Sequence, residues 1–135
     1  MDEDVQKKLV EYQLIDQHLK QMKGQLEMAE QQMVEALATL QSLEDFSRLD
    51  KDEEILVPVN NGIFAKATLK KGSKVLLNVG ASVVVDKSVE DAKKLVDTQR
   101  REIEKFHAAL SSNMDTLMER AAKLEKELSA QMDNV

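Results

Sequence analysis

Apolar residues recur at alternating spacings of three and four residues through the first third of the chain. Residues 1–48 contain twelve such positions, and eleven are apolar, with Lys8 as the exception. This heptad pattern, sustained over more than five heptads, predicts a long coiled-coil helix. The twelve positions are Val5, Lys8, Tyr12, Ile15, Leu19, Met22, Leu26, Ala29, Met33, Ala36, Leu40 and Leu43.

Residues 88–135 carry a second seam of the same length. Ser88 and Asp91 have the spacing of a capping box, which predicts that a helix begins here. Eleven of its twelve seam positions are apolar, and two consecutive four-residue steps at Phe106–Leu110–Met114 predict one stutter in the supercoil. The twelve positions are Val89, Ala92, Val96, Gln99, Ile103, Phe106, Leu110, Met114, Leu117, Ala121, Leu124 and Leu128.

The two seams can be aligned as one antiparallel helical hairpin. Proline and glycine, apart from Gly24, are confined to residues 58–80, so both flanking segments are free of helix breakers in their seams. Placing Leu19 opposite Met114 and Leu26 opposite Phe106 matches all twelve layers. We therefore expect a two-helix antiparallel coiled coil with a compact segment between its helices.

The central segment, residues 54–87, has the sequence pattern of short β-strands separated by turns. Asn61-Gly62 is a strong two-residue hairpin signal, and the only proline, Pro58, must direct its backbone nitrogen toward an unpaired strand edge. We expect strands at Ile55–Val59, Ile63–Leu69, Lys74–Val79 and Val83–Val85, with further turns at Lys71–Ser73 and Gly80-Ala81.

Two hairpins have too little surface to bury their own apolar face. A lone hairpin is marginal in water, and exposed strand edges seek partners. We therefore expect the strands to join a β-barrel made with other subunits. The residues expected to mediate this oligomerisation are Ile55, Val57, Val59, Ile63, Ala65, Ala67, Leu69, Val75, Leu77, Val79, Val83 and Val85.

The composition excludes several classes of function but identifies none. The net charge of −6 argues against nucleic-acid binding, and the absence of cysteine excludes disulfides, thiolate metal sites and thiol catalysis. The glycines fit no phosphate-binding loop, and His18 and His107 are isolated. The longest apolar stretch is too short to span a bilayer. We expect a cytoplasmic protein with no enzymatic activity, cofactor or metal.

The central segment resembles the alpha-class subunits of the prefoldin family. The similarity is most specific at LVPV (Leu56–Val59), GIFAKA (Gly62–Ala67) and VLLNVGASVVVDKS (Val75–Ser88). Four strands favour the alpha class, because beta-class subunits carry a single hairpin. One departure is the turn Asn60-Asn61-Gly62, where many relatives carry another glycine.

The resemblance implies an α+β fold, in which a long antiparallel coiled coil carries two β hairpins that join an oligomeric β-barrel. It also implies a hexamer of two alpha-class and four beta-class subunits. Such a complex is an ATP-independent holdase, which captures unfolded proteins at its coiled-coil tips and passes them to a chaperonin.

Apolar residues outside the seams cluster near both ends of the sequence. Lys8 would face Leu124 across the seam, which predicts a poorly packed layer there, and Val135 extends the apolar surface. These features suggest a client-binding tip, although scattered surface apolars at a frayed end would look the same. The open alternative is a structural subunit that assembles into rings or filaments without binding clients. The expected client-binding residues are Val5, Leu9, Val10, Leu14, Leu124, Leu128 and Met132.

Overall fold

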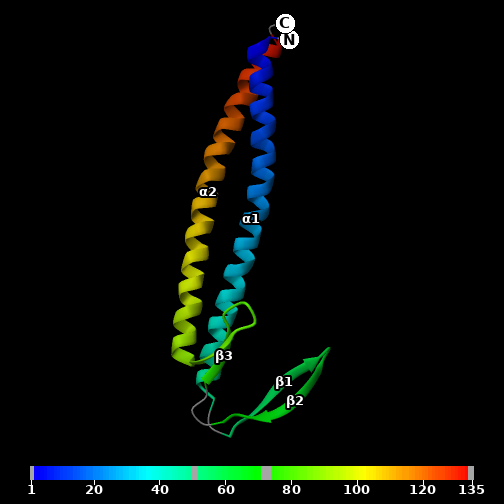
Figure 1. The fold of residues 1–135 in the computed structure, drawn as a ribbon. Coiled ribbons are helices and arrows are strands. Elements are labelled where there is room, and N and C mark those ends of the chain that lie inside the picture. Colours follow the sequence, from blue (N-terminus) through cyan, green and yellow to red (C-terminus); the bar gives the residue numbers. More distant parts are fainter. Residues whose placement is uncertain (1, 50–51, 71–73, 134–135) are drawn as a thin grey trace. The chain divides into compact units, whose positions relative to one another are not determined.

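The computed structural model describes residues 2–49, 52–70 and 74–133. Two long helices flank two antiparallel β-hairpins, so the predicted fold class is confirmed (Figure 1). The chain divides into two compact units, one formed by residues 1–33 and 101–135 and the other by residues 34–100. The elements are α1 (Glu3–Ser47), β1 (Glu54–Asn60), β2 (Ile63–Thr68), β3 (Lys74–Asn78), β4 (Val84–Ser88) and α2 (Val89–Asp133).

The predicted seam of α1 is confirmed at every position. All twelve seam residues are buried or half-buried, whereas most residues between them are exposed. Ile15, Met22 and Ala29 are the most deeply buried side chains of this helix. Gly24 lies on the exposed surface, and a Cβ placed there would meet no atom within 4 Å. The heptad pattern alone therefore determined which face of α1 is buried.

Helix α2 begins where the capping signal predicted. The backbone N–H of Asp91 donates to Ser88 Oγ at 3.1 Å, which satisfies one of the free donors of the first turn. Glu90 and Asp91 lie in that turn, where their negative charge complements the helix dipole.

The predicted seam of α2 is wrong at two positions. Phe106 is 52% exposed and Gln99 is also exposed, whereas their neighbours His107 and Arg100 are half-buried. The proposed Leu26–Phe106 layer therefore does not form. The two consecutive four-residue steps occur instead at Ala92–Val96–Arg100.

The polar side chains that replace Gln99 and Phe106 each place their polar end beside a carboxylate. His107 Nε2 lies 3.1 Å from Glu30 Oε1 on α1, and Arg100 Nη2 lies 3.0 Å from Asp97 Oδ1. A long side chain can bury its stem in a seam while its polar end reaches a partner. The choice of the most apolar residue at each step therefore misplaced the stutter.

Ion pairs across the seam establish that the helices are antiparallel within each unit. Arg120 donates from Nε to Glu11 Oε1 at 2.8 Å and from Nη2 to Glu11 Oε2 at 3.1 Å. In the other unit, Lys93 pairs with Glu44. The hydrogen bonds from Arg120 lower the pKa of Glu11, and those from Lys93 lower the pKa of Glu44. A bidentate arginine–carboxylate pair also fixes orientation, because its two bonds are parallel.

The first hairpin has the expected turn. Asn61 and Gly62 have φ angles of 36° and 81°, and a type I′ turn requires positive φ at both central residues. Ile55 pairs with Ala67 and Val57 with Ala65, and a bulge interrupts the register between Pro58 and Asn60.

The second hairpin differs from the prediction in its last strand. We expected Val83–Val85, but β4 spans Val84–Ser88 and runs directly into α2. The connection is Gly80-Ala81-Ser82, with φ angles of 105°, 50° and 62°, closed by a 3.0 Å bond from the Val79 N–H to the Val83 carbonyl. The prediction ended this strand too early, because β4 is apolar only in its first two residues and continues through Asp86 and Lys87. The turn expected at Lys71–Ser73 lies outside the described residues.

Substitutions at Leu110 and Phe106 test which residues of α2 are buried in the seam. Leu110→Ala should lower the free energy of unfolding by about 2–5 kcal/mol, because Leu110 is 7% exposed and its truncation leaves a cavity. Phe106→Ala, although it removes more atoms, should cost less than about 1 kcal/mol, as expected for a surface substitution. Urea denaturation of both variants measures the difference. If Phe106→Ala lost more unfolding free energy than Leu110→Ala, Phe106 would have to be buried in the seam, as the sequence pattern predicted.

The Glu11–Arg120 pair should contribute stability in a pH-dependent manner. The pKa of Glu11 is lower in the folded chain than in the unfolded chain, so its contribution is present above the unfolded pKa and is lost as the pH falls through the folded value. Glu11→Gln should therefore have a lower melting temperature than the wild type at pH 7 and low salt. The difference between the two melting temperatures should shrink as the pH falls through the folded pKa of Glu11. A constant difference across this range would exclude the ion pair as its cause.

Candidate functional site

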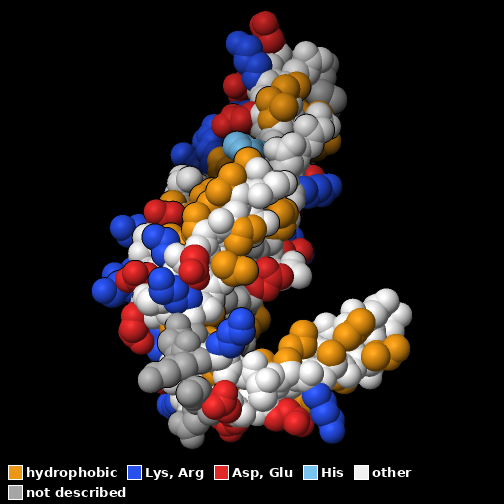
Figure 2. Space-filling model, turned by 60° about the horizontal axis from the view of Figure 1, so that its bottom comes forward, with side chains coloured by type: hydrophobic (Ala, Val, Ile, Leu, Met, Phe, Trp, Pro, Cys, Tyr) orange, Lys and Arg blue, Asp and Glu red, His pale blue; other side chains and the backbone are white. Residues whose placement is uncertain are grey.

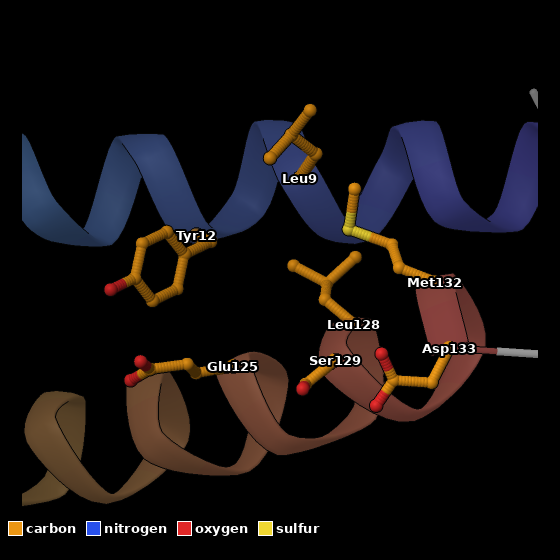
Figure 3. A pocket seen from close by; sticks show the side chains of 7 residues that line it. All are labelled: Leu9, Tyr12, Glu125, Leu128, Ser129, Met132 and Asp133. Atoms are coloured by element: carbon orange, nitrogen blue, oxygen red, sulfur yellow. The ribbon is translucent and has the colours of Figure 1, made fainter.

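An open groove lies between the helices where the first residues of α1 meet the last residues of α2, within the first unit. Its volume is about 430 Å³. Leu9 and Tyr12 come from α1, whereas Leu128 and Met132 come from α2 and point toward α1 (Figure 3). Glu125, Ser129 and Asp133 complete the lining. The groove thus has an apolar floor and an acidic α2 rim.

Heptad geometry explains why the groove opens on one flank of the seam. Leu9 directly follows the seam residue Lys8, and Glu125 directly follows Leu124. Residues that follow the second seam position of a heptad lie on one flank, and in an antiparallel pair the same flank of both helices meets. Met118, 49% exposed, lies one heptad before Glu125 and extends this flank on α2.

The opposite flank is closed by charged side chains. Lys8 Nζ lies 3.2 Å from Asp4 Oδ2 and 3.4 Å from Glu127 Oε2, and Gln131 Nε2 donates to Asp4 Oδ2 at 3.3 Å. The bonds from Gln131 and then Lys8 lower the pKa of Asp4, and the bond to Asp4 raises the pKa of Lys8. These contacts, together with Glu11–Arg120, hold the helices together on the flank away from the groove.

The structure divides the predicted client-binding residues into three groups. Leu9 and Met132 are exposed and lie in the groove, and Leu128 forms its buried floor. Val10 and Leu14 are also exposed but do not line the groove. The remaining two, Val5 and Leu124, are half-buried and fully buried in the seam.

The poorly packed layer expected at Lys8 and Leu124 is wrong. Leu124 is 0% exposed, because the Lys8 ammonium turns toward Asp4 and Glu127 and leaves only its stem beside the seam. Sequence reasoning also missed Tyr12, Glu125, Ser129 and Asp133 as groove residues. The signal available for Glu125 was its spacing of seven from both Met118 and Met132.

The residues expected to mediate oligomerisation lie on the two hairpins in the second unit. Ile55, Val57, Ala65 and Ala67 form two adjacent cross-strand pairs on one face of β1–β2. Leu77 pairs with Val85 in the second hairpin. Several members of the set are exposed in the single chain, among them Val59, Ile63, Val79 and Val83, whereas Leu69 and Val75 are half-buried.

Sequence reasoning missed the apolar residues on the other face of each hairpin. Leu56 and Phe64 are 62% and 56% exposed, and Leu76 and Val84 are also exposed. Apolar side chains are visible along the surface of the first hairpin in Figure 2. The unbroken apolar run from Ile55 to Val59 was the available signal, because such runs are typical of strands covered on both faces.

Two kinds of site are absent among the described residues. No group of three or more histidine, aspartate or glutamate side chains is placed to hold a metal ion within residues 2–49, 52–70 and 74–133. None of the helices in these ranges combines the length and apolar character needed to cross a membrane. The groove and the exposed hairpins are therefore the features on which a function can be proposed.

Comparison with known proteins assigns the chain to a family. The family model for the prefoldin subunit matches residues 15–133. Prefoldin subunit alpha of Archaeoglobus fulgidus is 27% identical over 129 residues, which cover 96% of this chain and 94% of that protein. Prefoldin subunit alpha of Methanococcus maripaludis is 31% identical over 107 residues, covering 78% and 71% of the two chains.

Solved structures agree in fold. The prefoldin beta subunit from Thermococcus strain KS-1 has a TM-score of 0.65 at 16% identity, covering 96% of this chain and 93% of that one. Filamentous PFD from Methanocaldococcus jannaschii has a TM-score of 0.56 at 19% identity, covering 96% and 98%. The chain belongs to the prefoldin family, and its relatives there are alpha subunits of the archaeal type.

Proposed function

We propose that this chain is the alpha-class subunit of an ATP-independent holdase that captures non-native proteins in the α1–α2 groove. Membership of the prefoldin family makes it a chaperone-type subunit. The observation that carries the finer proposal is the groove itself, where Leu9, Leu128 and Met132 surround an open volume of about 430 Å³. Methionine suits such a surface, because its unbranched thioether adapts to differently shaped apolar partners.

The groove is suited to weak and reversible capture. Each apolar side chain of a client that is buried there would contribute about 1.5–3 kcal/mol if burial were complete, and an open groove provides only part of this. Several subunits that hold one client would raise its effective concentration at the remaining grooves. Release to a chaperonin then requires only a receiver that binds more tightly, and no nucleotide.

We further propose that this subunit assembles with other subunits through its hairpins. We place this subunit in a cytoplasmic hexamer with beta-class subunits, two alpha with four beta, joined through the strands. The exposed apolar residues on both faces of β1–β2 support assembly with other chains, since a lone two-stranded sheet is marginal in water.

A second candidate function is structural assembly without client capture. It is favoured by the similarity to filamentous PFD from Methanocaldococcus jannaschii. Sedimentation of the chain alone and with a beta-class subunit distinguishes a self-assembling filament from a mixed complex of fixed size.

Charging the groove should abolish much of the holdase activity. Leu9→Asp with Met132→Asp places two carboxylates beside an already acidic rim, so apolar client segments lose their contact surface. Both side chains are outside the buried seam, so helix content and assembly should persist. We expect the complex to require several-fold more protein to suppress aggregation of a thermally unfolding client, measured by light scattering.

A matched variant controls for added charge. Leu95→Asp with Val34→Asp changes one residue on each helix, with exposures of 39% and 66% against 39% and 64% for Leu9 and Met132. These two residues do not line the groove, so suppression should remain close to the wild type. Equal loss in both double variants, or full activity in both, would contradict capture in the groove.

A further inference from the structure

The acidic rim of the α1–α2 groove carries two carboxylates, those of Glu125 and Asp133, that are not neutralised. Neither forms an ion pair or a hydrogen bond with another side chain in the described part of the chain, and no lysine or arginine lines the groove. Lys123 and Lys126 lie near Glu125 in the sequence, but both are exposed and neither lies in the groove. The charge of the rim is therefore available to a cation on a bound segment.

The acidic residues of the closed flank differ, because each has a cationic partner. Lys8 Nζ lies 3.2 Å from Asp4 Oδ2 and 3.4 Å from Glu127 Oε2. Arg120 holds Glu11 through two hydrogen bonds. Negative charge without a partner is thus found on the flank that is open to a ligand, where it attracts cationic groups and repels anionic ones.

The two carboxylates lie at opposite ends of the apolar floor. Figure 3 shows Glu125 below Tyr12 at one end and Asp133 at the other, with Leu128 between them. Asp133 follows Glu125 by eight residues, which corresponds to about 12 Å along a helix. An extended chain covers this length in about four residues. A segment that places apolar residues on the floor can therefore reach both carboxylates with basic residues on either side.

Tyr12 strengthens the preference for a cation at the Glu125 end. Its ring lines the groove opposite the Glu125 side chain (Figure 3). The face of an aromatic ring attracts a cation, so the ring and the carboxylate favour the same kind of client residue. Arginine suits this end especially well, because its planar guanidinium can stack on a ring and pair with a carboxylate.

We propose that the groove selects unfolded segments in which two lysine or arginine residues, about four residues apart, enclose a short apolar stretch. The apolar residues contact Leu9, Leu128 and Met132, and the basic residues pair with Glu125 and Asp133. This inference rests on the proposed capture of non-native proteins in the groove, and it specifies which segments are captured.

Peptides with one tryptophan in an apolar core test this selectivity. Because the chain contains no tryptophan, the fluorescence of the peptide reports binding to the full-length chain directly. The peptides share one core and differ only in their two flanking residues, which are lysine, glutamine or glutamate. At low salt we expect the lysine-flanked peptide to bind about tenfold more tightly than the glutamate-flanked peptide, with the glutamine-flanked peptide between them. Added salt should reduce this difference, because it screens the charges.

A pair of double variants assigns the selectivity to the rim. Glu125→Gln with Asp133→Asn removes the charge and keeps the shape, so this variant should bind the differently flanked peptides with similar affinity. Glu102→Gln with Asp115→Asn removes the same charge from exposed positions of α2 outside the groove. These positions lie about 15 Å or more along the helix from Glu125, beyond the screening length at physiological salt, so this control should keep the wild-type selectivity.

The outcomes separate this inference from the proposed capture itself. Unchanged selectivity in the rim variant, or equal loss in both double variants, overturns the inference. So does equally tight binding of a lysine-flanked peptide with a serine core, because charge alone would then be recognised. If the glutamine-flanked peptide does not bind the wild type, or binds Leu9→Asp with Met132→Asp equally well, capture in the groove fails and this inference fails with it.

Discussion

Burial of apolar side chains between α1 and α2 is the interaction on which the rest of the molecule depends. Among the described residues, the eight most buried apolar side chains all belong to the helices, and none belongs to a strand. They are Ile15, Met22, Ala29, Ala92, Val96, Leu110, Leu124 and Leu128. The helices thus provide their own core, whereas the hairpins have apolar residues on both faces and none of their described residues is fully buried. Their stability has to come from other chains, which makes assembly a physical requirement of the sequence.

The seam also explains how much of the structure could be predicted. Along α1, eleven of the twelve positions that the heptad spacing places in the seam are apolar. The pattern therefore predicted the buried face of this helix correctly. Along α2, the register between Val96 and Leu110 allowed either Gln99 and Phe106 or Arg100 and His107. Hydrophobicity favoured Phe106, but the helix is rotated the other way in this stretch, so Phe106 is 52% exposed and Arg100 and His107 are half-buried. A pairing such as His107–Glu30 depends on the other helix and cannot be read from one local pattern.

The sequence identified part of the residue set of the candidate site, and the client binding expected there stays a prediction. Leu9, Leu128 and Met132 were expected to act at the end of the coiled coil, and they do meet in one groove. Sequence reasoning could not separate them from Val10 and Leu14, because exposure alone does not indicate which flank a residue faces. Nor could it foresee that Lys8 would leave Leu124 fully buried, since this outcome depends on the placement of Asp4 and Glu127 around the lysine.

The asymmetry between the two flanks of the seam links stability to function. A groove that opened on both flanks would leave the last seam layers exposed to water and would separate the helices. The contacts of Lys8, Asp4 and Gln131, with the bidentate Glu11–Arg120 pair, close one flank through groups that remain partly solvated. Because such pairs are individually weak, they hold the helices together without making this end of the coiled coil rigid. The other flank can then stay apolar and open, and under the function proposed above its acidic rim at Glu125 and Asp133 favours client segments in which basic residues flank apolar ones.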